Sequence, residues 1–189
     1  MKRTALIAAD GFEEVEGLTV VDLLRRADLV CDIVALSDRK KIIGSHDIRI
    51  SADKAFSSTD FSSYDAVILP GGLRGTNALL ADSRIKELLQ FFYREGRLTA
   101  AVCAAPSVLG AAGLLQGKKA VCYPGIEDRL IGAEVCFDPV MQDGTVITSR
   151  GLGTSIPFAL QIIAYLEGRE TADRIGRKIV FPGLASEQP

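Results

Sequence analysis

The sequence predicts an α/β protein in which a mainly parallel sheet is covered by helices on both faces. Short apolar stretches alternate along the chain with longer stretches whose apolar residues recur at helical spacing. The short stretches, of which Leu98–Val102 is an example, lack the regular polar alternation of half-exposed strands, which is typical of strands buried on both faces. We expect one domain over residues 1–189, long enough to bury a core without disulfide bonds.

The strand and helix signals follow each other in order. Residues 4–9 form an apolar strand, and the next segment, 12–27, carries an apolar helical stripe with acids in its first turn and arginines in its last. The other expected elements are strands at 30–36, 66–69 and 98–102, a hairpin-like excursion at 41–51, short strands within 119–147, and helices at 83–95, 154–167 and 171–180. The tail after Gly183 is expected to be loose.

Composition and charge exclude several classes of protein. The net charge is −2, so no electrostatic attraction to nucleic acid or to an anionic membrane surface is expected. The first apolar run stops at Asp10, too short for a signal peptide, and Pro106 and two glycines interrupt the longest apolar stretch, which argues against a membrane span. The chain has four cysteines without CxxC spacing, so we expect reduced thiols in a cytoplasmic protein.

Cys103 lies where a buried strand passes directly into a helix. The strand is expected to end at Val102, and small residues with Pro106 open the helix. Free N–H groups at such a turn favour an anion, so we expect a strained turn and a thiol pKa below those of the other three cysteines. The alternative is a cysteine that only packs in the core.

Two further segments are expected at the same edge of the sheet, where ligands bind in parallel α/β proteins. The N–H groups of Gly71 and Gly72 would hold a developing oxyanion, or the two glycines form a plain turn. Glu16, if it faces Cys103, would act in its neutral form by donating a hydrogen bond to the thiolate. The helix dipole accounts for the other first-turn acids, Glu13 and Glu14.

Four motifs in register carry a resemblance to a known family. They are ADGFEEVE, ending at Glu16; LPGG, ending at Gly72; AVCAAP, around Cys103; and TSRGLGT, around Arg150. With them the chain resembles the ThiJ/PfpI superfamily over nearly its whole length, in the branch of the Parkinsonism-associated protein deglycase and its bacterial relatives. The resemblance implies a flavodoxin-like three-layer sandwich and a homodimer. It also implies an oxidation-prone nucleophile at Cys103, a protonated partner at Glu16 and oxyanion-binding glycines at 71 and 72.

The candidate pocket residues around this centre are Ala104, Tyr123, Arg150 and His46. Many family members have a histidine where this chain has Tyr123, and the only histidine, His46, lies in the 41–51 excursion, where relatives often carry an arginine near the dimer interface. A Cys–His protease dyad is therefore poorly supported, and Tyr123 either positions a substrate oxygen or packs as an aromatic residue. We expect no metal and no other cofactor, because no ligand residues cluster along the sequence.

Two classes of function stay open. In the first, the protein is a glyoxalase- or deglycase-type enzyme that acts on reactive dicarbonyls, such as methylglyoxal, or on early glycation adducts. In the second, it is a redox sensor or stress-response chaperone whose Cys103 is oxidised to the sulfinate. Protease and thiamine-related roles, which older family names suggest, have less support.

The expected partners are a small carbonyl substrate and a second copy of the chain. We expect the first helix, around 17–24, and the excursion that holds His46 to contribute to the dimer. Gly17, Leu18 and Val20 are expected to leave an apolar surface on that helix.

Overall fold

A seven-stranded sheet forms the centre of the computed structural model, which describes residues 1–182. The strand order is β10-β11-β7-β6-β1-β2-β5, and neighbouring strands are parallel except for the β10–β11 pair. The bounds of these strands are β1 Arg3–Ala8, β2 Val30–Ala35, β5 Lys54–Ala55, β6 Ala66–Leu69, β7 Leu98–Val102, β10 Val140–Asp143 and β11 Val146–Ser149. Two small two-stranded sheets pair β3 (Lys41–Ile43) with β4 (Arg49–Ser51) and β8 (Lys119–Ala120) with β9 (Glu134–Val135).

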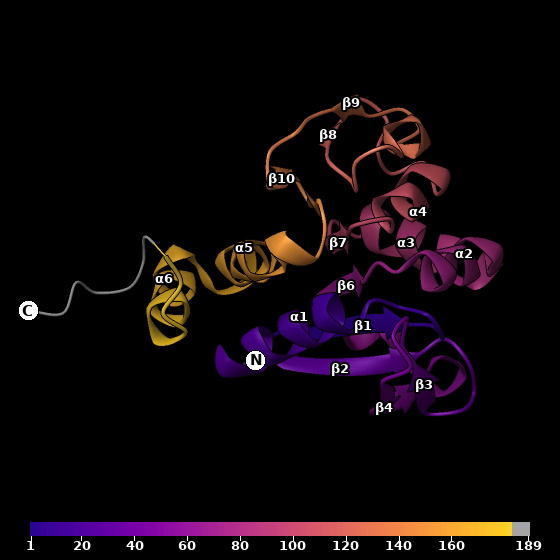
Figure 1. Cartoon of the computed structure of the whole chain (residues 1–189), viewed down its shortest axis with the longest axis horizontal. Helices are drawn as coiled ribbons and strands as arrows, with labels where there is room; N and C mark the ends of the chain where they lie inside the picture. The colour runs from indigo at the N-terminus through magenta and orange to yellow at the C-terminus, as the bar shows by residue number, and fades with distance from the viewer. Residues whose placement is uncertain (183–189) are drawn as a thin grey trace, which may run out of the picture.

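Helices cover both faces of the sheet, as the sequence predicts. In Figure 1, α5 lies on one side of β7 while α3 and α4 lie on the other. The α-helices are α1 (Glu14–Arg26), α2 (Leu73–Ala81), α3 (Ser83–Arg94), α4 (Pro106–Ala111), α5 (Ser155–Glu167) and α6 (Arg169–Lys178). Short 3₁₀ turns occur at Phe56–Ser58, Phe61–Ser63, Glu127–Arg129 and Leu152–Thr154.

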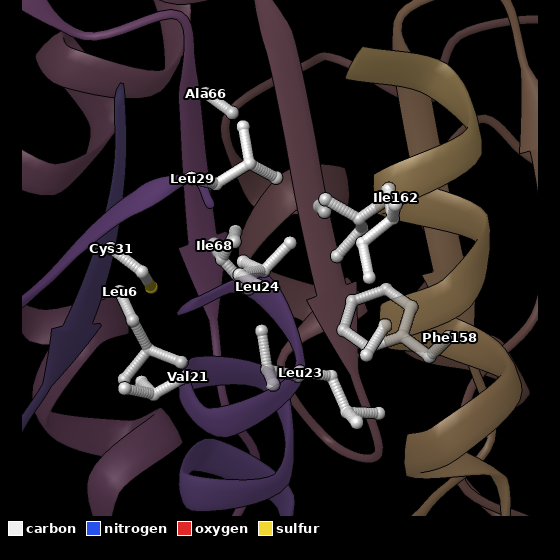
Figure 2. Packing of buried hydrophobic residues seen from close by; sticks show 14 of the residues in the cluster. Leu6, Val21, Leu23, Leu24, Leu29, Cys31, Ala66, Ile68, Phe158 and Ile162 are labelled. Atoms are coloured by element: carbon white, nitrogen blue, oxygen red, sulfur yellow. The ribbon is translucent and has the colours of Figure 1, made fainter. Parts of the chain in front are cut away.

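Each face of the sheet has its own apolar core. Alternate residues of β1 point to opposite faces, so Leu6 packs with α1 and α5 while Ile7 packs with α2, α3 and α4. In Figure 2, Leu23 and Leu24 of α1 lie near Phe158 and Ile162 of α5, and these helices pack against each other. The result is a three-layer arrangement that holds the sheet rigidly at the edge where the strands end.

Several element boundaries differ from the sequence-based prediction. The sequence predicts only a turn at Pro70-Gly71-Gly72, yet the following residues Leu73–Ala81 form helix α2. The sequence predicts short strands within 119–147 without placing them, and one of them, β11, pairs with β7 inside the main sheet. Helix α6 begins at Arg169, two residues before the expected start.

The structure of residues 1–182 contains no helix that is long and apolar enough to cross a membrane. The expectation of a loose tail after Gly183 concerns residues outside the described part of the chain.

Candidate active site

Cys103 occupies the strained turn that the sequence predicts. It directly follows β7, and its φ of 64° lies in the left-handed region, which is rare for a residue with a side chain. Two backbone hydrogen bonds hold it there: its N–H donates to the Ser149 carbonyl at 3.0 Å, and its carbonyl accepts from the Tyr123 N–H at 2.8 Å. The residue is half-buried, so the turn presents the thiol at the end of the sheet.

Glu16 reaches this thiol from helix α1. Its side chain is buried and lies beside the Cys103 side chain at Gly71, and its Oε2 accepts the Gly71 N–H at 2.9 Å. Gly71 makes the contact possible, because a Cβ there would lie 2.5 Å from both Cys103 Cβ and Glu16 Oε2. The structure thus brings together Cys103, Glu16 and Gly71, which the sequence analysis had grouped from three separate segments.

Burial governs the protonation of the Glu16–Cys103 pair. It raises the pKa of Glu16 to about 7, with help from the negative charge of Glu13 and against the hydrogen bonds from Cys103 and Gly71. Burial, followed by the charge of Glu16, also raises the pKa of Cys103 to about 12, although the N–H groups of Gly72 and Ala104 lower it. The expectation of an unusually acidic thiol is therefore wrong while Glu16 is ionised, since the buried Cys31 has a pKa of about 11.

The two groups are in contact and must be treated as one titrating unit. Because a negative Glu16 opposes ionisation of Cys103, the pair carries at most one negative charge near neutral pH. When Glu16 holds the remaining proton, the charge lies on the sulfur, which is more exposed than the carboxyl group and receives two backbone N–H groups rather than one. A thiolate beside a neutral Glu16 is the form that the sequence analysis expects, whereas burial and the charge of Glu16 both raise the pKa of the Cys103 thiol.

The two glycines have different roles. The N–H of Gly71 already donates to Glu16, so it is not available for an oxyanion, which differs from the expectation for this residue. The N–H groups of Gly72 and Ala104 lower the pKa of the Cys103 thiol, so they are the donors that favour its ionised form.

Tyr123 and Arg150 lie beside the thiol turn. Tyr123 follows a short strand, is 52% exposed and has its ring close to Gly151, next to which Glu16 also lies. Arg150 directly follows Ser149 and donates from Nη1 to the Phe137 carbonyl at 3.3 Å. The Tyr123 main chain bonds to Cys103, whereas the Arg150 side chain bonds to the Phe137 carbonyl, and neither side chain hydrogen-bonds to Cys103.

His46 lies apart from the thiol and contacts the start of α1 instead. Its Nδ1 is 3.2 Å from Glu14 Oε2 and 3.7 Å from Glu13 Oε2, and Ser45 Oγ contacts both carboxylates. Burial opposes ionisation of Glu14, but hydrogen bonds from His46 and Ser45 lower the pKa of its carboxyl group to about 2. The helix dipole alone therefore does not account for Glu13 and Glu14, which anchor the loop between β3 and β4 (residues 44–48).

The same contacts qualify the expectation about metal ligands. The structure does bring His46 to the adjacent residues Glu13 and Glu14, with the donor atoms of all three within 4.8 Å of one another, although His46 is distant from them in the sequence. These atoms are engaged in hydrogen bonds with one another and with Ser45, and we assign no metal to them.

The sequence analysis did not identify the two backbone groups that hold the Cys103 turn. Ser149, at the end of β11, accepts the Cys103 N–H, and the Tyr123 backbone rather than its ring fixes the turn. No sequence signal identifies a backbone partner, because any residue type supplies the same carbonyl or N–H group.

The raised pKa of Glu16 predicts a pH-dependent stability. The folded protein binds a proton at Glu16 more tightly than the unfolded chain, whose ordinary value is 4.5. This contribution is complete below pH 4.5 and is lost as the pH rises through about 7. Glu16→Gln, which cannot ionise, should gain stability relative to the unmodified protein by up to about 3 kcal/mol between pH 5 and pH 8.5. Urea unfolding at both pH values measures this, and an unchanged difference would contradict the raised pKa.

The comparisons with known proteins agree with this geometry. A profile described as the DJ-1/PfpI family matches residues 2–165. The chain is 36% identical to protein dj-1beta of Drosophila melanogaster, with 95% of this chain and 98% of that protein covered. It is 30% identical to a protein of Pyrococcus abyssi named a deglycase, with 87% and 99% covered. The structure of Toxoplasma gondii DJ-1, oxidised, is similar with a TM-score of 0.92 at 30% identity, over 96% of this chain and 100% of that one. The chain therefore has the flavodoxin-like fold and belongs to the DJ-1/PfpI family.

Proposed function

We propose that the protein is a cysteine-dependent enzyme of the glyoxalase or deglycase type, acting on reactive dicarbonyls or their early glycation adducts. The observation that carries the proposal is the contact between a half-exposed Cys103 and a carboxyl group, Glu16, whose pKa is raised to about 7. An acid that exchanges its proton near neutral pH beside a nucleophile is the arrangement that proton-transfer chemistry requires. The similarity to a protein named a deglycase supports the same class of substrate.

The reaction can be written with these residues and water alone. The Cys103 thiolate attacks the aldehyde carbon of methylglyoxal, and the new oxyanion, held by the N–H groups of Gly72 and Ala104, takes the proton of Glu16. The Glu16 carboxylate then removes the proton on that carbon and delivers it to the neighbouring ketone carbon, while the proton of the new hydroxyl group passes to the former ketone oxygen. This leaves a thioester of lactate, which water hydrolyses to lactate and the free thiol, so that no external oxidant or reductant is needed.

We expect the purified protein to convert methylglyoxal to lactate without glutathione. Cys103→Ser should abolish turnover, and Glu16→Gln should lower it by about a hundredfold or more, because the amide keeps a donor but cannot shuttle a proton. Enzymatic measurement of lactate decides this, with Asp22→Asn, a change on the exposed side of α1, as the control. Full turnover in Glu16→Gln would remove Glu16 from the mechanism.

The same geometry supports a second function, redox sensing, in which Cys103 is oxidised to the sulfinate. Cys103 is half-exposed beside N–H donors and a carboxyl donor, whereas Cys31 and Cys122 are buried. A structurally similar relative, Toxoplasma gondii DJ-1, has been crystallised in an oxidised form. All four cysteines are free thiols, which fits the reducing cytoplasm in which we propose that the protein works.

Mild peroxide should therefore convert Cys103 to the sulfinic acid before the other three cysteines. The modification should persist in Glu16→Gln, which keeps a hydrogen-bond donor, and should be less stable in Glu16→Asp, whose side chain is one methylene shorter. Mass spectrometry of the peptides that contain each cysteine measures the order of oxidation. Equal oxidation of Cys103 and the half-buried Cys136 would contradict a privileged site.

We also propose a homodimer that uses the exposed apolar side chains of α1 and the β3–β4 hairpin. Val15, Leu18, Ile43 and Ile48 are 38–50% exposed. The expected surface differs in detail, because Gly17 and Val20 are buried within the chain's own core.

Light scattering at micromolar concentration should give twice the mass of one chain. Leu18→Glu should shift the population towards the monomer, since it places a charge in the apolar contact, while Tyr165→Glu, on α5, should not. A monomer in the unmodified protein would contradict the proposal.

A further inference from the structure

We infer that Glu13 is a positioning residue that favours the proton on Glu16, and so increases the fraction of molecules with the negative charge on Cys103, and that the 44–48 loop moderates this effect through His46. The inference rests on the proposed role of Cys103 as the nucleophile and adds a control element to that site. The proposed reaction does not require the contact between the 44–48 loop and the start of α1, and the inference gives this contact a role.

The first step is a direct connection through the Gly71 peptide. The carbonyl of Gly71 accepts the Glu13 N–H at 2.9 Å, and the N–H of Gly71 donates to Glu16 Oε2 at 2.9 Å. Glu13 precedes α1 by one residue, and its carbonyl accepts the Gly17 N–H at 3.1 Å. The main chain of Glu13 is therefore fixed against both the glycine turn and the helix that carries Glu16.

The second step is the effect of one carboxylate on the other. Only 15% of the Glu13 side chain is exposed, so solvent screens its charge weakly. A like charge disfavours ionisation of its neighbour, and Glu13 accordingly raises the pKa of the Glu16 carboxyl group, in addition to the larger effect of burial. The groups that face Glu16 are Cys103, Glu13 and the Gly71 N–H.

The single negative charge of the Glu16–Cys103 pair can lie on either group. With one proton left, the pair is either a thiolate with a neutral Glu16 or a thiol with a Glu16 carboxylate. Glu13 disfavours the second form, because that form puts two carboxylates three residues apart at the start of one helix. It therefore increases the fraction of the reactive thiolate.

The Glu13 carboxylate also contacts the 44–48 loop. The groups that face the Glu13 carboxylate are Ser45 Oγ at 3.1 Å, His46 Nδ1 at 3.7 Å and the adjacent Glu14. Among the described residues, His46 is the only basic side chain in an ion pair with Glu13 or Glu14. A protonated His46 offsets part of the Glu13 charge, so the loop weakens the effect of Glu13 on Glu16.

The test measures the rate of Cys103 alkylation by iodoacetamide from pH 5 to pH 9, with mass spectrometry to locate the label. In Glu13→Gln the Glu16 carboxylate form becomes easier to populate. We therefore expect the midpoint of the profile to move to lower pH while the plateau rate falls about threefold or more. Glu13→Asp should keep most of the plateau rate.

The variant His46→Gln should act in the opposite direction. It removes the positive partner of Glu13 from an exposed position, so the midpoint should move to higher pH and the plateau rate should not fall. Asp22→Asn, which removes a carboxylate from the exposed side of α1, should leave the profile unchanged. In a Glu16→Gln background, Glu13→Gln should have no effect on the plateau, because the second acid of the pair is gone.

Several outcomes would overturn the inference. If Glu13→Gln lowers the plateau without moving the midpoint, its role is only structural. If Glu13→Gln does not fold, as shown by circular dichroism, an unchanged profile in His46→Gln overturns the inference by itself. If Cys103 is alkylated no faster than the other cysteines in the unmodified protein, the nucleophile proposed above is wrong and the inference falls with it.

Discussion

The contact between the Glu16 carboxyl group and the Cys103 thiol requires three segments of the chain to lie close to one another. These segments follow β1, β6 and β7, and they meet because no side chain separates them at Gly71. A Cβ at Gly72 would also collide with the main chain at Gly11 and Glu13, and both Gly11 and Gly72 adopt positive φ values. The site is therefore made by backbone-to-backbone packing at the end of the sheet, and it tolerates very little change of volume.

This packing carries an energetic cost that the rest of the fold must offset. A buried carboxyl group with a raised pKa and a cysteine at positive φ are each unfavourable in isolation. The two apolar cores hold both features in place, because the helices around the sheet fix the ends of β1, β6 and β7 from both faces. Figure 2 shows one of these cores, where α1, which carries Glu16, packs its leucines towards α5. The packing of α1 against α5 therefore also fixes the position of Glu16 relative to the Cys103 thiol.

Much of the fold and the centre of the site could be predicted from the sequence, and the misses share a physical cause. The turn at Cys103 was predictable because a buried strand, small residues and a proline leave few other conformations. The pKa of Cys103 was not, because it depends on burial and on the charge of Glu16 rather than on the local turn. Likewise, the single use of the Gly71 N–H and the contact of His46 with Glu14 depend on distances between segments that no local pattern records. Helix α2 could not be predicted in the same way, because it starts directly after a glycine turn and its nine residues give only a short helical pattern.

The proposed reactivity depends on a buried carboxyl group beside a thiol that is only partly buried. Cys103 is half-buried, and Tyr123 beside it is half-exposed, so water reaches the thiol region. A thiolate at such a place cannot rely on a dry pocket, and its charge must be held by short-range donors and by the position of one proton. The N–H groups of Gly72 and Ala104 supply the donors, and the buried Glu16 supplies the proton. In the proposed function, a partly exposed thiolate stabilised in this way would react according to the electrophilicity of its partner, so small dicarbonyls and peroxide are alternative reactants at one cysteine.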